Sequence, residues 1–290
     1  MRSEEEMFNL IITTAKKDER IRAVVLNGSR ANKNVKKDIF QDYDIVYVVN
    51  DTKLFREERS WIDQFGERLY MQYPEESSYY VADVENSYGW LIQFTDGNRL
   101  DLHVSTLEHT LKSIKEDRLY KILLDKDNCL INLPEPTDED YWVKRPTKEQ
   151  FHESCNEYWW CLNNIAKGLW REEIPYVMDM LNDCVRPMLV RLMEWKVGFL
   201  TDFSVSVGKS GKYINNWLEE EEWSLFLKTY PRGEVKDIWE SVFIMCDLFN
   251  NIAKDISYNM GVEYNEIEAN NSLKFLKHVH LLPKDATEIY

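Results

Sequence analysis

The sequence changes character at residues 133–140, LPEPTDED, a segment with two prolines and four acidic residues. Before it, short apolar runs such as VVL and IVYVV predict strands that are buried in a sheet. After it, these runs disappear, and long stretches with apolar residues at helical spacing take their place. The segment itself is typical of a linker. We therefore predict an α+β fold, with a mixed β-sheet and flanking helices over residues 1–135 and an all-helical bundle over residues 136–290.

Helices and strands are both expected in the first part. The spacing of Met7, Leu10, Ile11 and Thr14 predicts a helix over residues 3–17, and residues 53–67 also have a helical pattern. The sequence TDGN at residues 95–98 suits a hairpin turn, because Asp-Gly and Gly-Asn tolerate positive φ. The predicted strands are residues 21–26, 44–49, 90–94, 99–104 and 119–124.

The second part is expected to contain helices only. Pro175 is tolerated in the first turn of a helix, whereas Pro187 lies inside a helical pattern and predicts a kink. The acidic run EEEE at residues 219–222 suits the start of a helix, where negative charge is favourable. The predicted helices are residues 147–170, 174–199, 212–229 and 234–258.

The chain is acidic, with a formal net charge of −15 at pH 7 and an excess of Asp and Glu in both halves. Contacts with phosphate groups of a polyanion are made by Lys and Arg, so this charge disfavours a nucleic-acid partner. The same field would concentrate a cationic small molecule near the protein. Simple solubility explains an acidic surface equally well.

The composition also bears on location and on metal binding. No apolar run approaches the roughly 18–20 residues that cross a bilayer, and the start MRSEEEMFNL differs from a signal peptide. We therefore expect a cytoplasmic protein with reduced thiols and no membrane partner. The cysteines contain no CxxC pair and form no ligand pattern with the histidines, so their spacing does not predict a zinc site. They are Cys129, Cys155, Cys161, Cys184 and Cys246.

Two carboxylates, Asp42 and Asp44, lie where the second predicted strand begins. Residues i and i+2 of a strand face the same side, so these side chains project together. They repel each other unless a divalent cation lies between them. Asp101, which alternates with Leu100 and Leu102 on a later strand, can complete the set. Three such carboxylates suit Mg²⁺, and two ions about 4 Å apart can serve phosphoryl or nucleotidyl transfer.

Gly28 and Ser29 directly follow the first predicted strand. Glycine lets the backbone approach a phosphate closely, and N–H groups at the start of a following helix bind anions. The hydroxyl of Ser29 and the charge of Arg30 can add to such a site. Each element alone is most often an ordinary turn. Their order along the chain, with an acidic pair and a third acid following, is what makes the combination informative.

This ordered combination resembles the nucleotidyltransferase superfamily over about residues 20–105. The resemblance implies a mixed β-sheet core, ATP as co-substrate with Mg²⁺, and attack of a substrate hydroxyl on the α-phosphorus with release of pyrophosphate. Carried over by position, Asp42 and Asp44 are metal ligands, and Gly28 and Ser29 hold the triphosphate. Asp101 is either the third ligand or the base that takes the hydroxyl proton.

Longer segments give a more specific resemblance. These segments are similar to the bacterial aminoglycoside 6-adenylyltransferases, also called streptomycin adenylyltransferases, from residue 1 to about residue 213. The family implies transfer of AMP from ATP to a hydroxyl of streptomycin, and thereby antibiotic resistance. The matching segments are MRSEEEM, DERIR, LNGSR, FQDYDI, DGNRLDL, LLDKD, YWVKRPT, CNEYWW, AKGLWR and VGKSGKY.

A cationic acceptor needs carboxylates and aromatic faces. Glu153, Glu157 and Trp160 fall on roughly one stripe of the helix predicted over residues 147–170. Asp179 and Asp183 are one turn apart on the next predicted helix. We interpret these five as candidate substrate-binding residues, with a solvated helix face as the alternative.

Lys209 and Lys212, in VGKSGKY, lie around glycines ahead of a predicted helix but lack the form of a P-loop. We expect them to contact the triphosphate, with a solvated capping loop as an equal alternative. The oligomeric state is not determined by these patterns, and a monomer is the simpler expectation.

Two other functions fit the acidic triad. The acceptor could be a protein side chain or an RNA end, although the net charge weighs against RNA. The chain could also be a catalytically silent relative that binds a nucleotide for regulation, although its intact triad weighs against that function.

Overall fold

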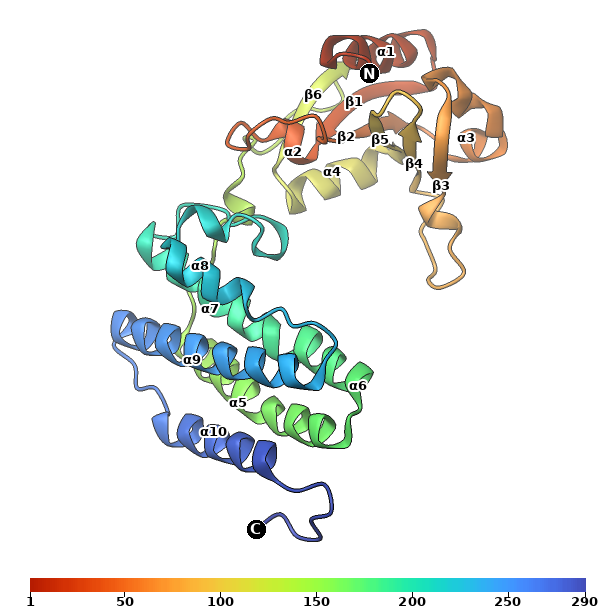
Figure 1. Ribbon diagram of the computed structural model, residues 1–290. Helices are drawn as coiled ribbons and strands as arrows, with labels where there is room; N and C mark the ends of the chain where they lie inside the picture. Colours follow the sequence, from red (N-terminus) through yellow and green to blue (C-terminus); the bar gives the residue numbers. More distant parts are fainter. The chain divides into compact units, whose positions relative to one another are not determined.

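The computed structural model describes residues 1–290, which divide into two compact units, Met1–Asp140 and Tyr141–Tyr290 (Figure 1). The boundary predicted after residue 135 falls just before this division. The first unit contains a β-sheet with helices and the second contains helices only, so the predicted α+β fold class is confirmed.

The first unit is built on one six-stranded sheet with the strand order β3-β4-β5-β2-β1-β6. Strands β2 and β5 are parallel and every other neighbouring pair is antiparallel, so the sheet is mixed. The strands are β1 (Ile21–Asn27), β2 (Tyr43–Val49), β3 (Arg68–Gln72), β4 (Ser87–Phe94), β5 (Arg99–Thr106) and β6 (Tyr120–Asp125). The helices are α1 (Glu4–Lys17), α2 (Gly28–Ala31), α3 (Lys53–Glu57) and α4 (Leu107–Glu116), with 3-10 turns at Arg59–Phe65 and Pro74–Glu76.

Helices α1 and α4 lie on opposite sides of this sheet (Figure 1). Alternate residues of β2, including Tyr43 and Tyr47, pack into the core that contains Ile11 of α1. The hydroxyl of Tyr47 donates a buried hydrogen bond to the carbonyl of Ile11 at 2.7 Å, which ties the helix to the sheet. Val48 faces the other way and packs with Ile114 of α4 and Tyr120. Because both faces of the sheet are covered at β2, most residues of this strand are apolar.

Several features of this unit differ from the sequence prediction, and helix α4 is one that had no predicted counterpart. Residues 53–67 were expected to form one helix, but α3 ends at Glu57 and a 3-10 turn follows. This break lets Trp61 pack edge-on against Phe55, with ring centroids 4.9 Å apart. Strand β3 has no predicted counterpart, since it is an edge strand with the mostly exposed Leu69 and Tyr70.

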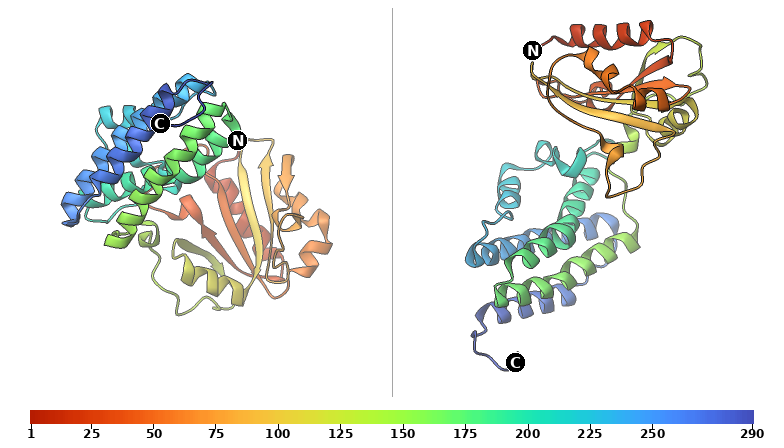
Figure 2. Two further views of the ribbon diagram at one scale, coloured as in Figure 1. Left: turned by 90° about the horizontal axis from the view of Figure 1, so that it is seen from below. Right: turned by 90° about the vertical axis from the view of Figure 1, so that its right-hand side faces the viewer.

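The second unit is a bundle around one large apolar core. Helices α5 and α10 lie side by side, as do α7 and α9 (Figures 1 and 2). In the core, the rings of Tyr158 and Phe249 stack with their centroids 3.6 Å apart. The helices are α5 (Lys148–Arg171), α6 (Ile174–Asp179), α7 (Arg186–Leu200), α8 (Glu220–Leu227), α9 (Val235–Met260) and α10 (Glu266–Leu281).

A π-helical segment, Met180–Val185, connects α6 and α7. Pro187 has no N–H group to donate to the carbonyl of Asp183, one α-helical turn earlier, so this turn of the helix widens. The kink predicted at Pro187 is thus a change of helix type over the preceding residues. The helix predicted over residues 212–229 is also shorter than expected, because α8 begins at Glu220 after two 3-10 turns. No helix in the structure has both the length and the apolar character that crossing a membrane requires.

Candidate active site

Three neighbouring strands of the first unit place the predicted acidic residues together. In the register of the sheet, Asn27 at the end of β1 pairs with Asp44 on β2, and Asp44 pairs with Asp101 on β5. Asp42 lies in the loop one residue before β2 begins. The side chains of Tyr43 and Leu100 enter the apolar core on the opposite face. Alternation along the strands therefore leaves Asp44 and Asp101 on one face of the sheet, and Asp42 is close enough to interact with both electrostatically.

The Gly28-Ser29 turn directly adjoins the acidic pair. Gly28 has φ +66°, and a Cβ atom at this position would lie 2.0 Å from Oδ2 of Asp44. Two features therefore require glycine at this position: the left-handed backbone and the close approach of the Asp44 carboxylate. The two halves of the predicted site thus touch in the folded chain.

The carboxylates of Asp42, Asp44 and Asp101, here called the acidic cluster, disfavour one another's ionised forms. Burial, together with the negative charges of Asp101 and Asp42, raises the pKa of Asp44 to about 6. Burial also raises the pKa of Asp42; Arg99 opposes this effect, and Asp101 adds to it. These carboxylates therefore favour a nearby positive charge.

Arg99 provides part of that charge. Its guanidinium donates two hydrogen bonds to the carboxylate of Asp101, at 2.9 and 2.7 Å, and lies 3.5 Å from Oδ2 of Asp42. The sequence analysis missed Arg99. It precedes Asp101 by two residues on the same strand, which is a signal that could have identified it.

The residues at this site fit Mg²⁺. The donor set is three carboxylates with hard oxygen ligands, which is the type of ligand that Mg²⁺ prefers. Burial and mutual repulsion raise the pKa values of Asp42 and Asp44, so a bound cation would favour their ionised forms. The side chain of Arg99 is 45% exposed, so it is free to move away from Asp42 and Asp101 if a cation replaces it.

Arg30 has a structural role in the first unit, and its contact with phosphate stays a prediction. Its side chain is only 7% exposed. It donates hydrogen bonds to the backbone carbonyls of Asp42 and Gln41, at 2.9 and 2.8 Å, and stacks on the ring of Tyr43. Arg30 therefore positions the turn that carries Asp42.

A second polar group continues the same face of the sheet. The carboxylate of Glu75 accepts a hydrogen bond from the backbone N–H of Gly89 and lies 3.5 Å from Nε2 of His103. Burial works against ionisation of Glu75, but the contact with His103 prevails and lowers its pKa. A Cβ atom on Gly89 would collide with the His103 ring, so the glycine makes room for it.

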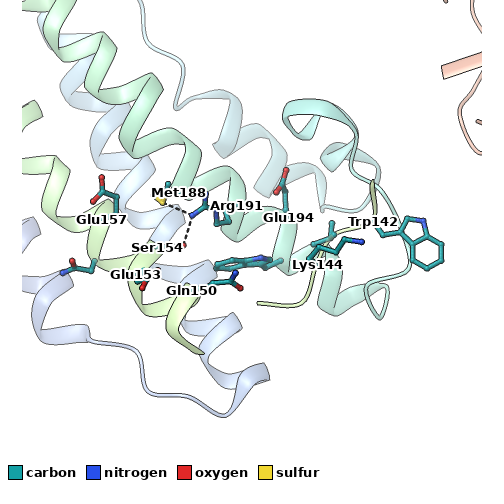
Figure 3. A pocket seen from close by; sticks show the side chains of 12 residues that line it. Trp142, Lys144, Gln150, Glu153, Ser154, Glu157, Met188, Arg191 and Glu194 are labelled. Carbon is teal, nitrogen blue, oxygen red and sulfur yellow. Dashed lines mark hydrogen bonds between the residues drawn. The ribbon is translucent and has the colours of Figure 1, made fainter. Parts of the chain in front are cut away.

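The helical unit contains a cavity of about 790 Å³ (Figure 3). Two of the predicted substrate-binding residues, Glu153 and Glu157, line it from α5. The other lining residues were not predicted, and they include Trp142, Lys144, Arg191, Glu194 and Trp195. A lone acid in the apolar run of α7 is the signal that could have indicated Glu194.

The charges of this cavity are mixed, with three carboxylates and two cations. Burial raises the pKa of Glu194, and the charge of Arg191 partly offsets this effect. Arg191 donates a hydrogen bond to the buried hydroxyl of Ser154 at 3.3 Å, which holds the guanidinium against α5 (Figure 3). Carboxylates and tryptophan rings in one cavity are suited to a cationic ligand.

The other predicted residues of this unit lie outside the lining of the cavity. Trp160 is 68% exposed, and Asp179 and Asp183 are also exposed. Lys209 and Lys212 are exposed and lie around a 3-10 turn. Their roles stay predictions.

The chain is similar along most of its length to known adenylyltransferases. The family model for streptomycin adenylyltransferase matches residues 1–279. The aminoglycoside 6-adenylyltransferase of Bacillus subtilis (strain 168) is 39% identical over 265 residues, covering 91% of this chain and 93% of that protein. The enzyme of the same description from Staphylococcus aureus is 35% identical over 271 residues, covering 93% and 96%.

Among solved structures, the crystal structure of an aminoglycoside 6-adenyltransferase from Bacillus subtilis matches with 34% identity and a TM-score of 0.48, covering 97% of this chain and 100% of that chain. The match of the family model and the identities along nearly the whole chain agree with the resemblance that its motifs indicated. The chain belongs to the streptomycin adenylyltransferase family.

Proposed function

We propose that this protein transfers AMP from ATP to a hydroxyl group of streptomycin, at the 6-position, and thereby confers resistance to the antibiotic. Membership of an ATP-using adenylyltransferase family supports the reaction and the co-substrate. The observation that carries the proposal is the contact of Gly28 with Asp44, beside Asp101 in the adjacent strand. It joins a turn suited to phosphate and a carboxylate cluster suited to metal in one site.

In this reaction the hydroxyl oxygen of the drug forms a bond to the α-phosphorus of ATP. The bond between the α-phosphorus and the bridging oxygen breaks, and pyrophosphate leaves. Asp42 and Asp44 would hold Mg²⁺, with Asp101 as the third ligand if it is not the base. The ion would supply positive charge beside the phosphates and the attacking hydroxyl. The backbone of Gly28 and the hydroxyl of Ser29 bind the triphosphate. The hydroxyl proton passes to a carboxylate, for which Asp101 and Glu157 are the candidates.

The cavity of the helical unit is proposed to bind the drug. Streptomycin is a polyhydroxylated cation, and Glu153, Glu157 and Glu194 supply carboxylates for its positive groups. The rings of Trp142 and Trp195 supply flat apolar faces. The net charge of −15 favours approach of a cation over the whole surface.

The direct test is to incubate the purified protein with ATP, Mg²⁺ and streptomycin. We expect pyrophosphate and adenylylated streptomycin in equal amounts, with the site of modification assigned by NMR. A sensitive bacterial strain that expresses the protein should also tolerate more of the drug. Absence of pyrophosphate release with intact, folded protein would contradict the proposal.

A first prediction concerns the proposed metal ligands. We expect Asp42→Asn and Asp44→Asn each to lower kcat by at least about 10²–10³-fold, since loss of a metal ligand removes several kcal/mol of transition-state stabilisation. Each substitution also relieves like-charge repulsion, so without Mg²⁺ the melting temperature should equal or exceed that of the parent. Steady-state kinetics and thermal unfolding in EDTA measure the two effects. Near-normal turnover in either variant would remove that residue from the metal site.

A further inference from the structure

Two cysteines and a glutamate meet in the helical unit, on a different set of residues from the acidic cluster of the first unit. The sulfur atoms of Cys161 and Cys184 and a carboxylate oxygen of Glu157 all lie within 4.8 Å of one another. The thiol of Cys161 donates a hydrogen bond to Oε1 of Glu157 at 3.3 Å. We call these three residues the thiol cluster.

The fold creates this cluster from residues that are distant in sequence. Glu157 and Cys161 are one turn apart on α5, so their side chains share a face of that helix. Cys184 comes from the π-helical segment, which packs against α5. Cys184 lies within the wider turn that precedes Pro187. Spacing rules missed this pair because neither a CxxC motif nor a histidine is involved.

The donor set selects a particular class of ion. Thiolates are soft ligands that bind Zn²⁺ and similar ions, whereas Mg²⁺ prefers oxygen ligands. Three protein ligands and one open position are a common arrangement for Zn²⁺. Cys161 is 5% exposed, but Cys184 is only partly buried and Glu157 is exposed, so an ion can reach the cluster from solvent.

We propose that Cys161, Cys184 and Glu157 form a binding site for a thiophilic divalent cation of the Zn²⁺ class, with water as the fourth ligand. On binding, two metal–sulfur bonds and one metal–oxygen bond form, and the two thiols release their protons to the solvent. Burial and the nearby Glu157 carboxylate raise the pKa of Cys161 to about 12, so this thiol keeps its proton until a metal replaces it.

The site has a consequence for the enzyme, which rests on the function proposed above. Glu157 belongs both to the thiol cluster and to the lining of the 790 Å³ cavity, where Figure 3 labels it. A carboxylate bound to a metal ion is no longer available to a cationic drug. Occupation of the thiol cluster should therefore weaken streptomycin binding and leave ATP binding unchanged.

The test uses the full-length, reduced protein and Co²⁺ as a spectroscopic substitute for Zn²⁺. Binding should produce a thiolate-to-cobalt charge-transfer band, and added Zn²⁺ should remove the band while excess Mg²⁺ should not. Loss of even an outer-shell partner costs about 10–100-fold in metal affinity, so Cys161→Ser and Cys184→Ser should each lose at least that much. Competition with a chromophoric chelator measures the affinity for Zn²⁺.

Two matched controls come from the same chain. Cys155→Ser removes another buried thiol of α5 that is outside the cluster, and Cys129→Ser removes a thiol of the first unit. Both variants should keep the band and the affinity of the parent. Circular dichroism and melting temperatures show whether each variant is folded, so a loss of binding by unfolding is recognised.

Several results would overturn the site. One is the absence of a band in the folded parent protein. Another is a band that persists in the Cys161→Ser/Cys184→Ser double variant. A third is formation of a Cys161–Cys184 disulfide under mild oxidant with no metal bound by the reduced protein, which would make the pair a redox element. These spectroscopic outcomes do not depend on streptomycin turnover, so they fail or succeed separately from the proposed function.

Discussion

Gly28 shows how closely one residue couples the two halves of the candidate active site. A side chain at this position would overlap the carboxylate of Asp44, and the backbone φ of +66° already disfavours any residue but glycine. The carboxylate of Asp44 therefore takes its place because residue 28 has no Cβ. Arg30, two residues later, holds the backbone of Gln41 and Asp42 in turn. The turn and the acidic pair thus position each other.

A second prediction follows from this coupling. Gly28→Ala should lose about 1–2 kcal/mol of folding stability for its left-handed backbone. It should also displace Asp44, and a shift of about 1 Å at a catalytic group can cost on the order of 10²-fold in rate. The matched control is Gly261→Ala, where φ is +63° and no atom lies within 4 Å of the added Cβ. Thermal unfolding and kcat/KM measure both variants.

Gly28→Ala should destabilise the protein at least as much as Gly261→Ala, because it adds the overlap with Asp44 to the same backbone strain. Only Gly28→Ala should lose activity. Equal activity losses in both variants would mean that stability explains the effect. Full activity in Gly28→Ala would show that the contact with Asp44 does not matter for catalysis.

For single residues, the sequence predicted the position of a side chain where that position depends on local structure. Alternation along a strand is a local property, and it predicted that Asp42 and Asp44 share a face. The structure also sets Asp101 beside them, although their role as metal ligands stays a prediction. The contacts of Arg99 could have been suspected from its spacing to Asp101. Those of Arg30 could not, because they depend on how the loop before β2 returns to α2.

Among the elements, the β4–β5 hairpin is anchored to the start of the chain. The turn that joins the strands carries Asp96, and Arg2 donates hydrogen bonds to its carboxylate from both its backbone and its side chain. Arg2 also donates to the carbonyl of Phe65, and Asn98 donates to Asp96. Burial opposes ionisation of Asp96, but the bonds from Arg2 and Asn98 prevail and lower its pKa well below the usual range.

A third prediction uses this ion pair. The pKa of Asp96 is lower in the folded state than its ordinary value of 3.8, so the pair stabilises the fold above about pH 4. That contribution is lost as the pH falls through the folded pKa. Asp96→Asn keeps the shape of the side chain but removes its charge, and it should lower the melting temperature at pH 7. The deficit relative to the parent should stay constant from pH 8 to pH 5 and shrink below pH 4.

Thermal unfolding across this pH range, by circular dichroism, measures the deficit. Asp63→Asn offers a comparison, because Asp63 pairs with Arg68 in a more exposed ion pair. Exposed ion pairs contribute only about 0–1 kcal/mol, so this variant should melt close to the parent. A deficit of Asp96→Asn that grows on acidification would contradict the assigned direction of the pKa.

Elements with strong periodicity were predicted well, and those shaped by tertiary packing were not. Helices α1, α5 and α9 and the strands of the sheet centre have patterns that are visible in isolation. Strand β3 has no such pattern. It lies at the edge of the sheet, and most of its side chains are exposed. The π-helical segment was missed for another reason. Its apolar spacing is nearly that of an α-helix, and Pro187 by itself indicates a kink without specifying a widened turn.

At the scale of the whole molecule, the two units divide the proposed work. The sequence predicted two parts of the chain, because a linker separates strand patterns from helix patterns. It did not predict the cavity, whose walls come from residues 142–144, α5 and α7. Those segments meet only through the packing of the bundle, so residues such as Glu194 could not be assigned to a site from their spacing alone.

The last prediction tests the division of work. Glu153→Gln and Glu194→Gln, in the helical unit, should raise KM for streptomycin by about 10–100-fold, since a hydrogen bond to a charged group contributes about 1.5–3 kcal/mol. Neither should change KM for ATP, because the cavity that contains Glu153 and Glu194 includes none of the residues proposed to contact phosphate. Glu263→Gln is the matched control. It removes the same charge from an exposed position outside the cavity, so it reports the effect of net charge alone.

Asp179→Asn and Asp183→Asn complete the comparison, because the sequence indicated these residues and the cavity does not include them. If the cavity binds the drug, both should behave like Glu263→Gln. Higher ionic strength should raise KM for streptomycin in every variant, as expected for a cation drawn to an acidic protein. The reverse ranking, with large effects at Asp179 and Asp183 and none at Glu153 and Glu194, would move the drug site to the exposed face around α6 and the π-helical segment.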